Sequence, residues 1–232
     1  MINYYLYLTI GRKVLMALSG FFLMVFLLQH LAINLTSLLP DNGTTFNTIS
    51  HFMGTNPLVQ FVLQPVLIFG FLFHLLMGII LDYQNKKASI KYYANKNKNS
   101  SWMSRNMIIT GIMVFLFLCL HFVDFWIPEI TIKYIDGDMS GLHNGEYRYY
   151  TDIRLKFNDL WRVVLYVFSF IFLSLHLLHG FQSSFQSVGF RSNKYTHIVK
   201  KLSYAYGVLV PAGFVIVAVF HYLNNLLHPI SH

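Results

Sequence analysis

Five long apolar segments constrain this sequence more than any other feature. They cover roughly residues 14–39, 58–81, 107–127, 161–181 and 205–227. A helix needs about 20 residues to cross the ~30 Å hydrocarbon core of a bilayer, and each segment provides that length. Of all residues, 55% are hydrophobic and only 11% are charged. We therefore expect an all-α membrane protein, a bundle of five transmembrane helices that forms a single domain over residues 1–232.

Lys and Arg residues gather in alternate connections between these segments. Two precede the first segment, six lie between the second and third, and four lie between the fourth and fifth. The connection between the first and second segments has none, and acidic residues offset the basic ones in the 128–160 connection. Because basic loops remain in the cytoplasm, we expect a cytoplasmic N-terminus and an outside C-terminus. The net charge of +8 thus reflects topology and indicates no nucleic-acid partner.

Histidines are the ionisable residues within these segments. The first four segments carry His30, His74, His121 and His176 in turn, and no Asp, Glu, Lys or Arg lies in the middle of any segment. A single buried histidine in a membrane helix is most often a hydrogen-bond partner between helices. Four of them in four successive helices point to a functional site, because ionisable groups at this depth are costly.

Depth sorts these histidines into two pairs. His30 and His121 lie late in segments that run outward, and we call them the outer pair. His74 and His176 lie late in segments that run inward, and we call them the inner pair. At ~1.5 Å per residue, the two levels differ by roughly 10 to 15 Å along the membrane normal. Two pairs at two depths predict two stacked cofactors.

Ligand chemistry favours haem as that cofactor. A compact metal site normally draws more than two ligands from the protein, whereas a porphyrin supplies four equatorial nitrogens itself. Two histidines then complete six-coordination, and such a centre transfers electrons. Cys119 is the only cysteine, so the chain has no C-x-x-C-H attachment motif and cannot ligate an iron–sulfur cluster through its own cysteines. We expect two non-covalent haems of the b type.

Glycines recur at matched distances from the histidines. Gly78 and Gly180 follow the inner pair by four residues, and Gly20 and Gly111 precede the outer pair by ten, which places them near the inner level. Glycine is common in membrane helices because it permits close packing. The matched spacing also predicts room for a porphyrin face against the backbone.

Two further histidines compete for the same roles. His179 lies three residues from His176 on the same helix face, so spacing alone leaves both open as ligands. The glycine match favours His176 and leaves His179 as a propionate or hydrogen-bond partner. His221 reaches the outer level in the fifth segment, where we expect it to donate a hydrogen bond.

Several segments resemble a known family of membrane cytochromes. They read GRKVLMALSGFFLMVFLLQHLAINL, FNTISHFMGTNP, FHLLMG, LHFVDFW and LHLLHGFQSSFQSVG. Together they resemble the cytochrome b anchor subunit of succinate dehydrogenase and fumarate reductase, in its single-chain, five-helix, dihaem form. The resemblance implies that the outer and inner pairs are the axial ligands of two haems, with His176 preferred over His179.

The resemblance also implies a function. The chain would anchor a flavoprotein and an iron–sulfur subunit at the cytoplasmic face of a bacterial inner membrane and pass electrons between their clusters and membrane quinone, expected to be menaquinone. By itself the chain would not act on succinate. The basic 83–106 connection is a candidate docking surface. One alternative is the dihaem cytochrome b of a hydrogenase or formate dehydrogenase, and another is a proton-coupled transporter with a histidine relay.

The sequence indicates the residues that contact the quinone and the haem propionates less clearly than it indicates the haem ligands. Quinone chemistry moves protons with electrons, so its site needs polar groups at the membrane edge. The outer candidates are His51, Asn47, Asp124 and Glu129, of which His51 is preferred because it lies in the family-like FNTISHF. Candidate propionate partners are Arg12, Lys13 and Lys87 for the inner haem, and Arg162 and Lys133 for the outer one. The 128–160 connection is long for the family, and Asn144-Gly145 predicts a small hairpin in it.

Overall fold

The computed structural model describes residues 2–90, 106–143, 145–190 and 192–229. Within them, five helices are long and apolar enough to cross a membrane, which confirms the five predicted spans. They are Ile10–Leu38, Val59–Lys87, Met107–Ile135, Leu160–Ser187 and Tyr195–Leu227. Most run past the predicted ends, because helical hydrogen bonding continues into polar turns that a hydropathy pattern leaves out. Most of the basic 83–106 connection, residues 91–105, lies outside the described residues.

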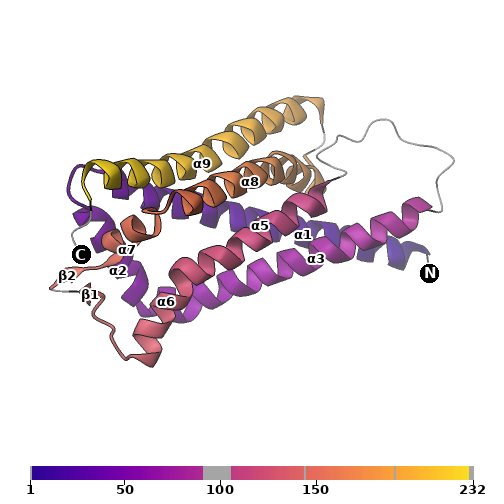
Figure 1. Cartoon of the computed structure of the whole chain (residues 1–232). Helices are drawn as coiled ribbons and strands as arrows, with labels where there is room; N and C mark the ends of the chain where they lie inside the picture. Colours follow the sequence, from indigo (N-terminus) through magenta and orange to yellow (C-terminus); the bar gives the residue numbers. More distant parts are fainter. Residues whose placement is uncertain (1, 91–105, 144, 191, 230–232) are drawn as a thin grey trace.

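The long helices are joined by short helical pieces and one hairpin. In chain order the elements are α1 (Ile2–Leu35), η1 (Thr36–Leu38), α2 (Thr44–Thr55), η2 (Val59–Leu63), α3 (Gln64–Ile90), α5 (Met107–His121), η3 (Phe122–Trp126), α6 (Ile127–Ile130), η4 (Thr131–Ile135), β1 (Leu142–His143), β2 (Glu146–Tyr147), α7 (Tyr149–Lys156), α8 (Leu160–Ser187) and α9 (Asn193–Leu227). The two termini lie at opposite ends of the bundle (Figure 1). We call the end with α2, α7 and the strands the hairpin end, and the other the N-terminal end.

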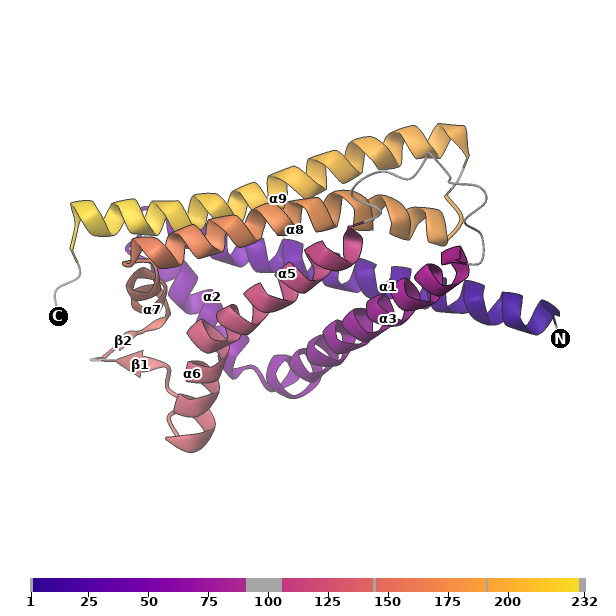
Figure 2. The ribbon, with the colours of Figure 1, turned by 45° about the vertical axis from the view of Figure 1, so that its right-hand side comes forward.

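Helix α8 is at the centre of the packing. It contacts α1, α5 and α9, while α3 packs against α1 and α5. Helix α9 runs along α8 in both views of the ribbon (Figure 2). The buried core lies mainly along α8 and α9 and includes Tyr166, Phe170, Leu173, Phe214 and Val217. The four helices that carry the histidine pairs are therefore packed around one another.

Prolines account for the irregular turns of the long helices. Pro211 lies inside α9 and has no N–H for the Gly207 carbonyl four residues earlier. The Ser174 hydroxyl of α8 donates to that carbonyl at 2.6 Å, so the freed acceptor is satisfied by the neighbouring helix. The π-helical turns η2 and η3 likewise lie just before Pro65 and Pro128.

The hairpin end is fastened to α2. Asn47 of α2 donates to the Tyr147 carbonyl at 2.9 Å and accepts from the Tyr150 N–H at 2.8 Å. Strands β1 and β2 pair antiparallel, Leu142 opposite Tyr147, which confirms the predicted hairpin, although Asn144 itself lies outside the described residues. These bonds hold the connection between α5 and α8 over the end of the bundle.

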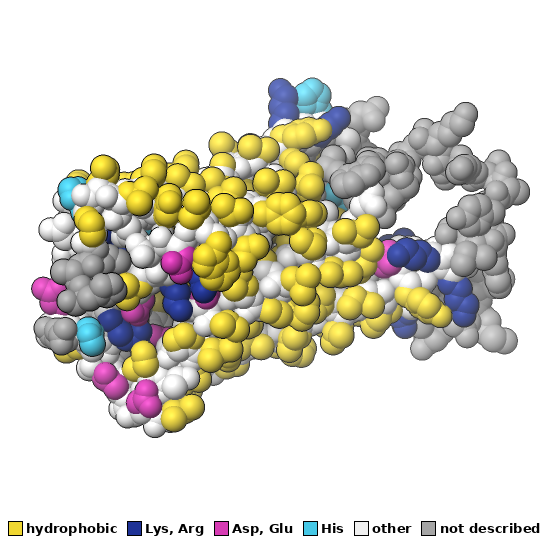
Figure 3. All heavy atoms as spheres, viewed as in Figure 1, with side chains coloured by type: hydrophobic (Ala, Val, Ile, Leu, Met, Phe, Trp, Pro, Cys, Tyr) yellow, Lys and Arg dark blue, Asp and Glu magenta, His cyan; other side chains and the backbone are white. Residues whose placement is uncertain are grey.

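Apolar and charged side chains occupy different parts of the surface. A broad band of apolar side chains covers the middle of the molecule, and charged side chains gather toward the two ends (Figure 3). Large apolar residues in the band are well exposed, among them Val25 at 70%, Phe69 at 69% and Leu209 at 68%. Such exposure is unfavourable in water and suits contact with lipid.

Candidate functional site

The inner pair forms one ring contact across the bundle. His74 of α3 and His176 of α8 have ring centroids 6.4 Å apart, with the ring planes inclined at 72°. A metal–imidazole bond is about 2 Å long, so two imidazoles on one metal have centroids roughly 6 Å apart. The two rings therefore stand at the separation that a shared metal requires. His179, the rival ligand from the sequence, lies one turn away and is half-buried.

Hydroxyl groups orient both inner rings. Ser19 Oγ lies 3.0 Å from His74 Nδ1, and Thr110 Oγ1 lies 3.3 Å from His176 Nδ1. Each hydroxyl donates its one proton, at 2.9 Å, to the carbonyl three residues earlier in its own helix. While it keeps that bond, each hydroxyl accepts from the imidazole Nδ1–H. This tautomer leaves the Nε2 lone pair of both rings free for a metal, the arrangement that hydrogen-bonded metal ligands adopt.

Two of the expected glycines lie against the inner rings. A Cβ added at Gly20 would stand 3.6 Å from His74 Cε1, and one added at Gly111 would stand 3.4 Å from His176 Cε1. Gly78 and Gly180 do not face these rings. Their added Cβ atoms would instead meet the side-chain ends of Met16 and Met107. The glycines ten residues before the outer pair thus border the inner pair, at the level that the sequence predicts for them.

The outer pair lies nearer the hairpin end. His30 of α1 and His121, the last residue of α5, have ring centroids 5.8 Å apart and planes inclined at 82°. Phe26 stacks on His30, and Phe117 lies beside His121, each four residues before its histidine. Phe214 of α9 also contacts His30, at 5.8 Å. Aromatic rings thus surround this pair with apolar surface.

Two short sequence patterns each occur twice, once in the pair of helices α1 and α3 and once in the pair α5 and α8. The pattern M-x-x-[S/T]-G, followed by histidine ten residues after the glycine, occurs at residues 16–30 of α1 and 107–121 of α5. The pattern H-L-L-x-G occurs at residues 74–78 of α3 and 176–180 of α8. The sequence analysis used the glycines and histidines but missed Ser19 and Thr110, although the shared pattern could have revealed them. Each pair of helices supplies one ligand candidate and one orienting hydroxyl to the inner site.

Polar residues near the outer pair are bound to one another. Asp124 is 2% exposed, receives a hydrogen bond from Tyr166 Oη at 2.8 Å and pairs with Arg162. The Tyr166 ring contacts His121 with centroids 6.4 Å apart. His221 is fully buried and lies 2.9 Å from Ser37 Oγ through Nε2. Ser37 Oγ also lies 2.6 Å from the Asn34 carbonyl, and while it donates there His221 is the donor to Ser37.

The basic residues predicted to contact haem propionates differ in their exposure. Arg12, Lys13 and Lys87 are exposed near the N-terminal end. Lys133, by contrast, is 2% exposed, donates to the Gly54 carbonyl and lies 2.6 Å from Glu129 Oε1. Of the two cations expected near the outer haem, Arg162 and Lys133, each is therefore engaged with a carboxylate.

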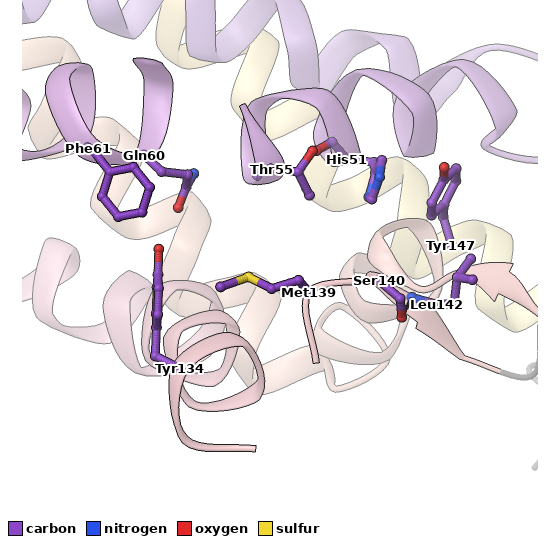
Figure 4. Close-up of a pocket in the computed structure, with 10 residues that line it drawn as sticks. His51, Thr55, Gln60, Phe61, Tyr134, Met139, Ser140, Leu142 and Tyr147 are labelled. Carbon is purple, nitrogen blue, oxygen red and sulfur yellow. Dashed lines mark hydrogen bonds between the residues drawn. The ribbon is translucent and has the colours of Figure 1, made fainter. Parts of the chain in front are cut away.

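A pocket of about 520 Å³ opens at the hairpin end (Figure 4). His51 and Thr55 of α2, Gln60 and Phe61 of η2, and Tyr134 of η4 lie around it. The remaining lining residues, apart from Gly54, come from the chain between η4 and α7: Met139, Ser140, Leu142 and Tyr147. His51 stacks on Tyr147 with centroids 4.3 Å apart. Of the four quinone candidates, His51 lines the pocket, whereas Asn47, Asp124 and Glu129 are bound to other residues.

Comparisons with known proteins do not assign a function to this site. No family model, curated protein or solved structure matches the chain. What can be said of its chemistry therefore comes from the two histidine pairs, their hydrogen bonds and the pocket.

Proposed function

We propose that the chain is a dihaem cytochrome b that anchors a succinate dehydrogenase or fumarate reductase and passes electrons between its iron–sulfur subunit and membrane quinone. The observation that carries the proposal is the inner pair. His74 and His176 stand opposite each other at a metal-sharing distance, with both Nδ1–H groups directed at hydroxyls.

The number of ligands favours haem over a bare metal ion. In the part of the chain that the structure describes, no group of three or more His, Cys, Asp or Glu side chains could hold a metal ion. Two imidazoles per site suffice only where the cofactor brings its own equatorial ligands. When bound between each pair, haem would be held by the two histidines of that pair and would supply a one-electron redox centre.

The residues of this chain would set the properties of that centre. Ser19 and Thr110 fix the ring orientation of the inner pair, and the rings around His30 and His121 keep the outer site apolar. Gly20 and Gly111 leave space beside the inner rings. Fixed ligands and a dry site suit electron transfer, because little has to rearrange when the charge changes.

The charge distribution supports the orientation and the partners. Exposed Arg12, Lys13, Lys87, Lys200 and Lys201 lie toward the N-terminal end, which would face the cytoplasm. The flavoprotein and iron–sulfur subunits would dock there. The choice of succinate and fumarate as their substrates, and of a bacterial inner membrane, rests on the sequence resemblance alone.

The pocket beside His51 is the best candidate for the quinone. Its volume of about 520 Å³ falls within the range of small-molecule sites, about 300 to 1,000 Å³. Phe61, Tyr134 and Met139 give it an apolar interior, and His51 and Gln60 offer polar groups. A quinone ring with two carbonyls needs this combination.

Purification of the tagged chain from its own membranes tests the proposal. We expect a flavoprotein and an iron–sulfur protein to copurify, and succinate to reduce the bound haem. Haem reduction by formate or hydrogen, with no response to succinate, would instead assign the chain to the neighbouring class of cytochromes. A colourless protein without redox partners would contradict the proposal and support a histidine relay.

A further inference from the structure

Two buried polar atoms beside the pocket lack hydrogen bonds within the described part of the chain. They are His51 Nδ1 and Tyr149 Oη, and a third atom beside them, Glu129 Oε1, is held by the ion pair with Lys133. Buried polar groups in folded proteins nearly always have a partner, so a local concentration of exceptions calls for a physical reason. None of the three atoms is needed to hold a ligand of either histidine pair.

Two glycines bring these atoms together. A Cβ added at Gly141 would stand 3.1 Å from His51 Nδ1 and 2.5 Å from Tyr149 Oη. A Cβ added at Gly54 would stand 3.4 Å from Tyr149 Oη and 3.4 Å from Glu129 Oε1. The tyrosine hydroxyl therefore lies close to both the imidazole and the carboxylate without bonding either directly, and any side chain at either glycine would enter the space around it.

An ion-pair network continues from Glu129 to the surface. Arg148 pairs with Glu129 and, at 2.9 Å, with Asp152, whose side chain is 40% exposed. Burial is the main reason that the pKa of the Asp152 carboxyl is raised. On the other side, Lys133 Nζ lies 2.6 Å from Glu129 Oε1. The network thus runs from Lys133, which bonds the carbonyl of Gly54 in the pocket wall, to a carboxyl in contact with solvent.

Tyr149 keeps its proton under ordinary conditions. Burial, and then the nearby Glu129 charge, raise the pKa of Tyr149 to about 12. A neutral hydroxyl can donate to one neighbour while it accepts from another. With a water molecule bridging the gap on each side, it can pass a proton from the imidazole to the carboxylate without becoming ionised.

We propose that His51, Tyr149 and Glu129 form a proton-transfer path between the pocket and the surface at the hairpin end. The inference rests on the proposed function, because it requires a quinone in the pocket. When a hydroquinone is oxidised there, its two O–H bonds break, two electrons leave through the electron-transfer chain and two protons leave one after the other. Reduction of a quinone takes up two electrons and two protons by the reverse course.

Each proton would move in the same order. The pocket-facing nitrogen of His51 accepts a proton from the hydroquinone, and the other ring nitrogen gives one to Tyr149 Oη. The hydroxyl passes its own proton to Glu129, whose side chain is 21% exposed and releases the proton to solvent. The long 128–160 connection, which supplies Tyr149 and Glu129, thereby gains a role.

Tyr149→Phe is the sharpest variant, because the hydroxyl that it removes has no hydrogen bond to lose within the described residues. A purely structural role predicts an unchanged or higher unfolding temperature and unchanged turnover. The path predicts the same stability with quinone-linked turnover about 100-fold lower. Tyr150→Phe, at the adjacent position, is the matched control and should leave turnover unchanged.

Glu129→Gln provides a second variant, with exposed Glu146→Gln as its control. We expect Glu129→Gln to abolish a carboxyl band in the redox-induced infrared difference spectrum, and added azide or imidazole to restore part of the lost turnover. A raised KM for quinone without rescue would overturn the path and make Glu129 a positioning residue. Full turnover in Tyr149→Phe would overturn the path as well.

The same preparations separate this inference from the proposed function. Haem content and succinate oxidation by an artificial electron acceptor should be unchanged in every variant. If the unmodified complex lacks haem or quinone-linked activity, the proposed function fails. If it has both and the variants behave like their controls, only the proton path fails.

Discussion

His74 and His176 approach each other from helices α3 and α8 with ring centroids 6.4 Å apart, and each ring is held through Nδ1 by a hydroxyl of another helix. Four helices therefore define this one site. The arrangement fixes which ring nitrogen can reach a metal, and it leads to predictions that separate ligands from their neighbours.

Replacing either inner histidine should remove one haem and leave the other. His176→Ala is expected to lower the haem content from two per chain to one, because His74 alone would not hold the inner haem. His179→Ala, one turn away, is the control and should retain both. Extracted haem and low-temperature spectra measure the difference; loss of haem in His179→Ala alone would exchange the roles of the two residues.

Ser19→Ala should weaken the inner haem without abolishing it. The substitution removes the acceptor for His74 Nδ1–H, and the loss of such a partner typically lowers metal affinity by about 10- to 100-fold. We expect faster haem loss to a scavenger and a shifted reduction potential for one of two haems. Ser169→Ala is the control, since that hydroxyl bonds only the backbone of its own exposed helix face. Equal haem retention in both variants would argue against the orienting role.

Bulk at Gly111 should displace the inner haem, whereas bulk at Gly180 should be tolerated better. A Cβ at Gly111 already stands 3.4 Å from the His176 ring, so a leucine there must move the imidazole. At Gly180 the nearest atom is the flexible end of Met107. The haem content of Gly111→Leu and Gly180→Leu tests this prediction. A greater loss of haem in Gly180→Leu than in Gly111→Leu would show that Gly180, and not Gly111, lies beside the haem.

His51→Ala should reduce quinone-linked turnover with both haems retained. The imidazole lines the pocket at the hairpin end and is remote in sequence from all four proposed ligands. His143→Ala, an exposed histidine of β1, serves as the control. If both variants turn over quinone like the unmodified protein, the pocket is not the quinone site.

Asp124→Ala should destabilise the hairpin end. The carboxylate is buried with Arg162 and Tyr166, and removal of one partner of a buried ion pair costs about 3 to 5 kcal/mol. Asp138→Ala, which removes an exposed carboxylate with local hydrogen bonds, should change stability far less. Unfolding in detergent measures both; equal midpoints would mean that the buried pair contributes little.

The sequence predicted the parts of this fold that depend on apolar length. The five spans follow from it, and helix direction combined with position along each helix places His30 beside His121 and His74 beside His176. Such inferences succeed because a membrane fixes both the length and the alternating direction of its helices.

Contacts between polar residues were not predictable in the same way. Ser19 and Thr110 look like ordinary small residues of membrane helices until the histidines of other helices are placed beside them. The sequence suggested Lys133 as a propionate partner and Glu129 as a quinone contact, yet they pair with each other in a network closed by α2 and the hairpin. Whether a charged side chain is buried depends on tertiary packing, and the sequence of a connection does not show which segments will pack over it.

The amount of non-covalent haem per chain tests the central claim most directly. Extraction and reduced-minus-oxidised spectra of the purified protein should give two b-type haems per chain, one for each histidine pair. A chain that binds none in its native membrane would contradict the account and return the four histidines to packing or proton transfer.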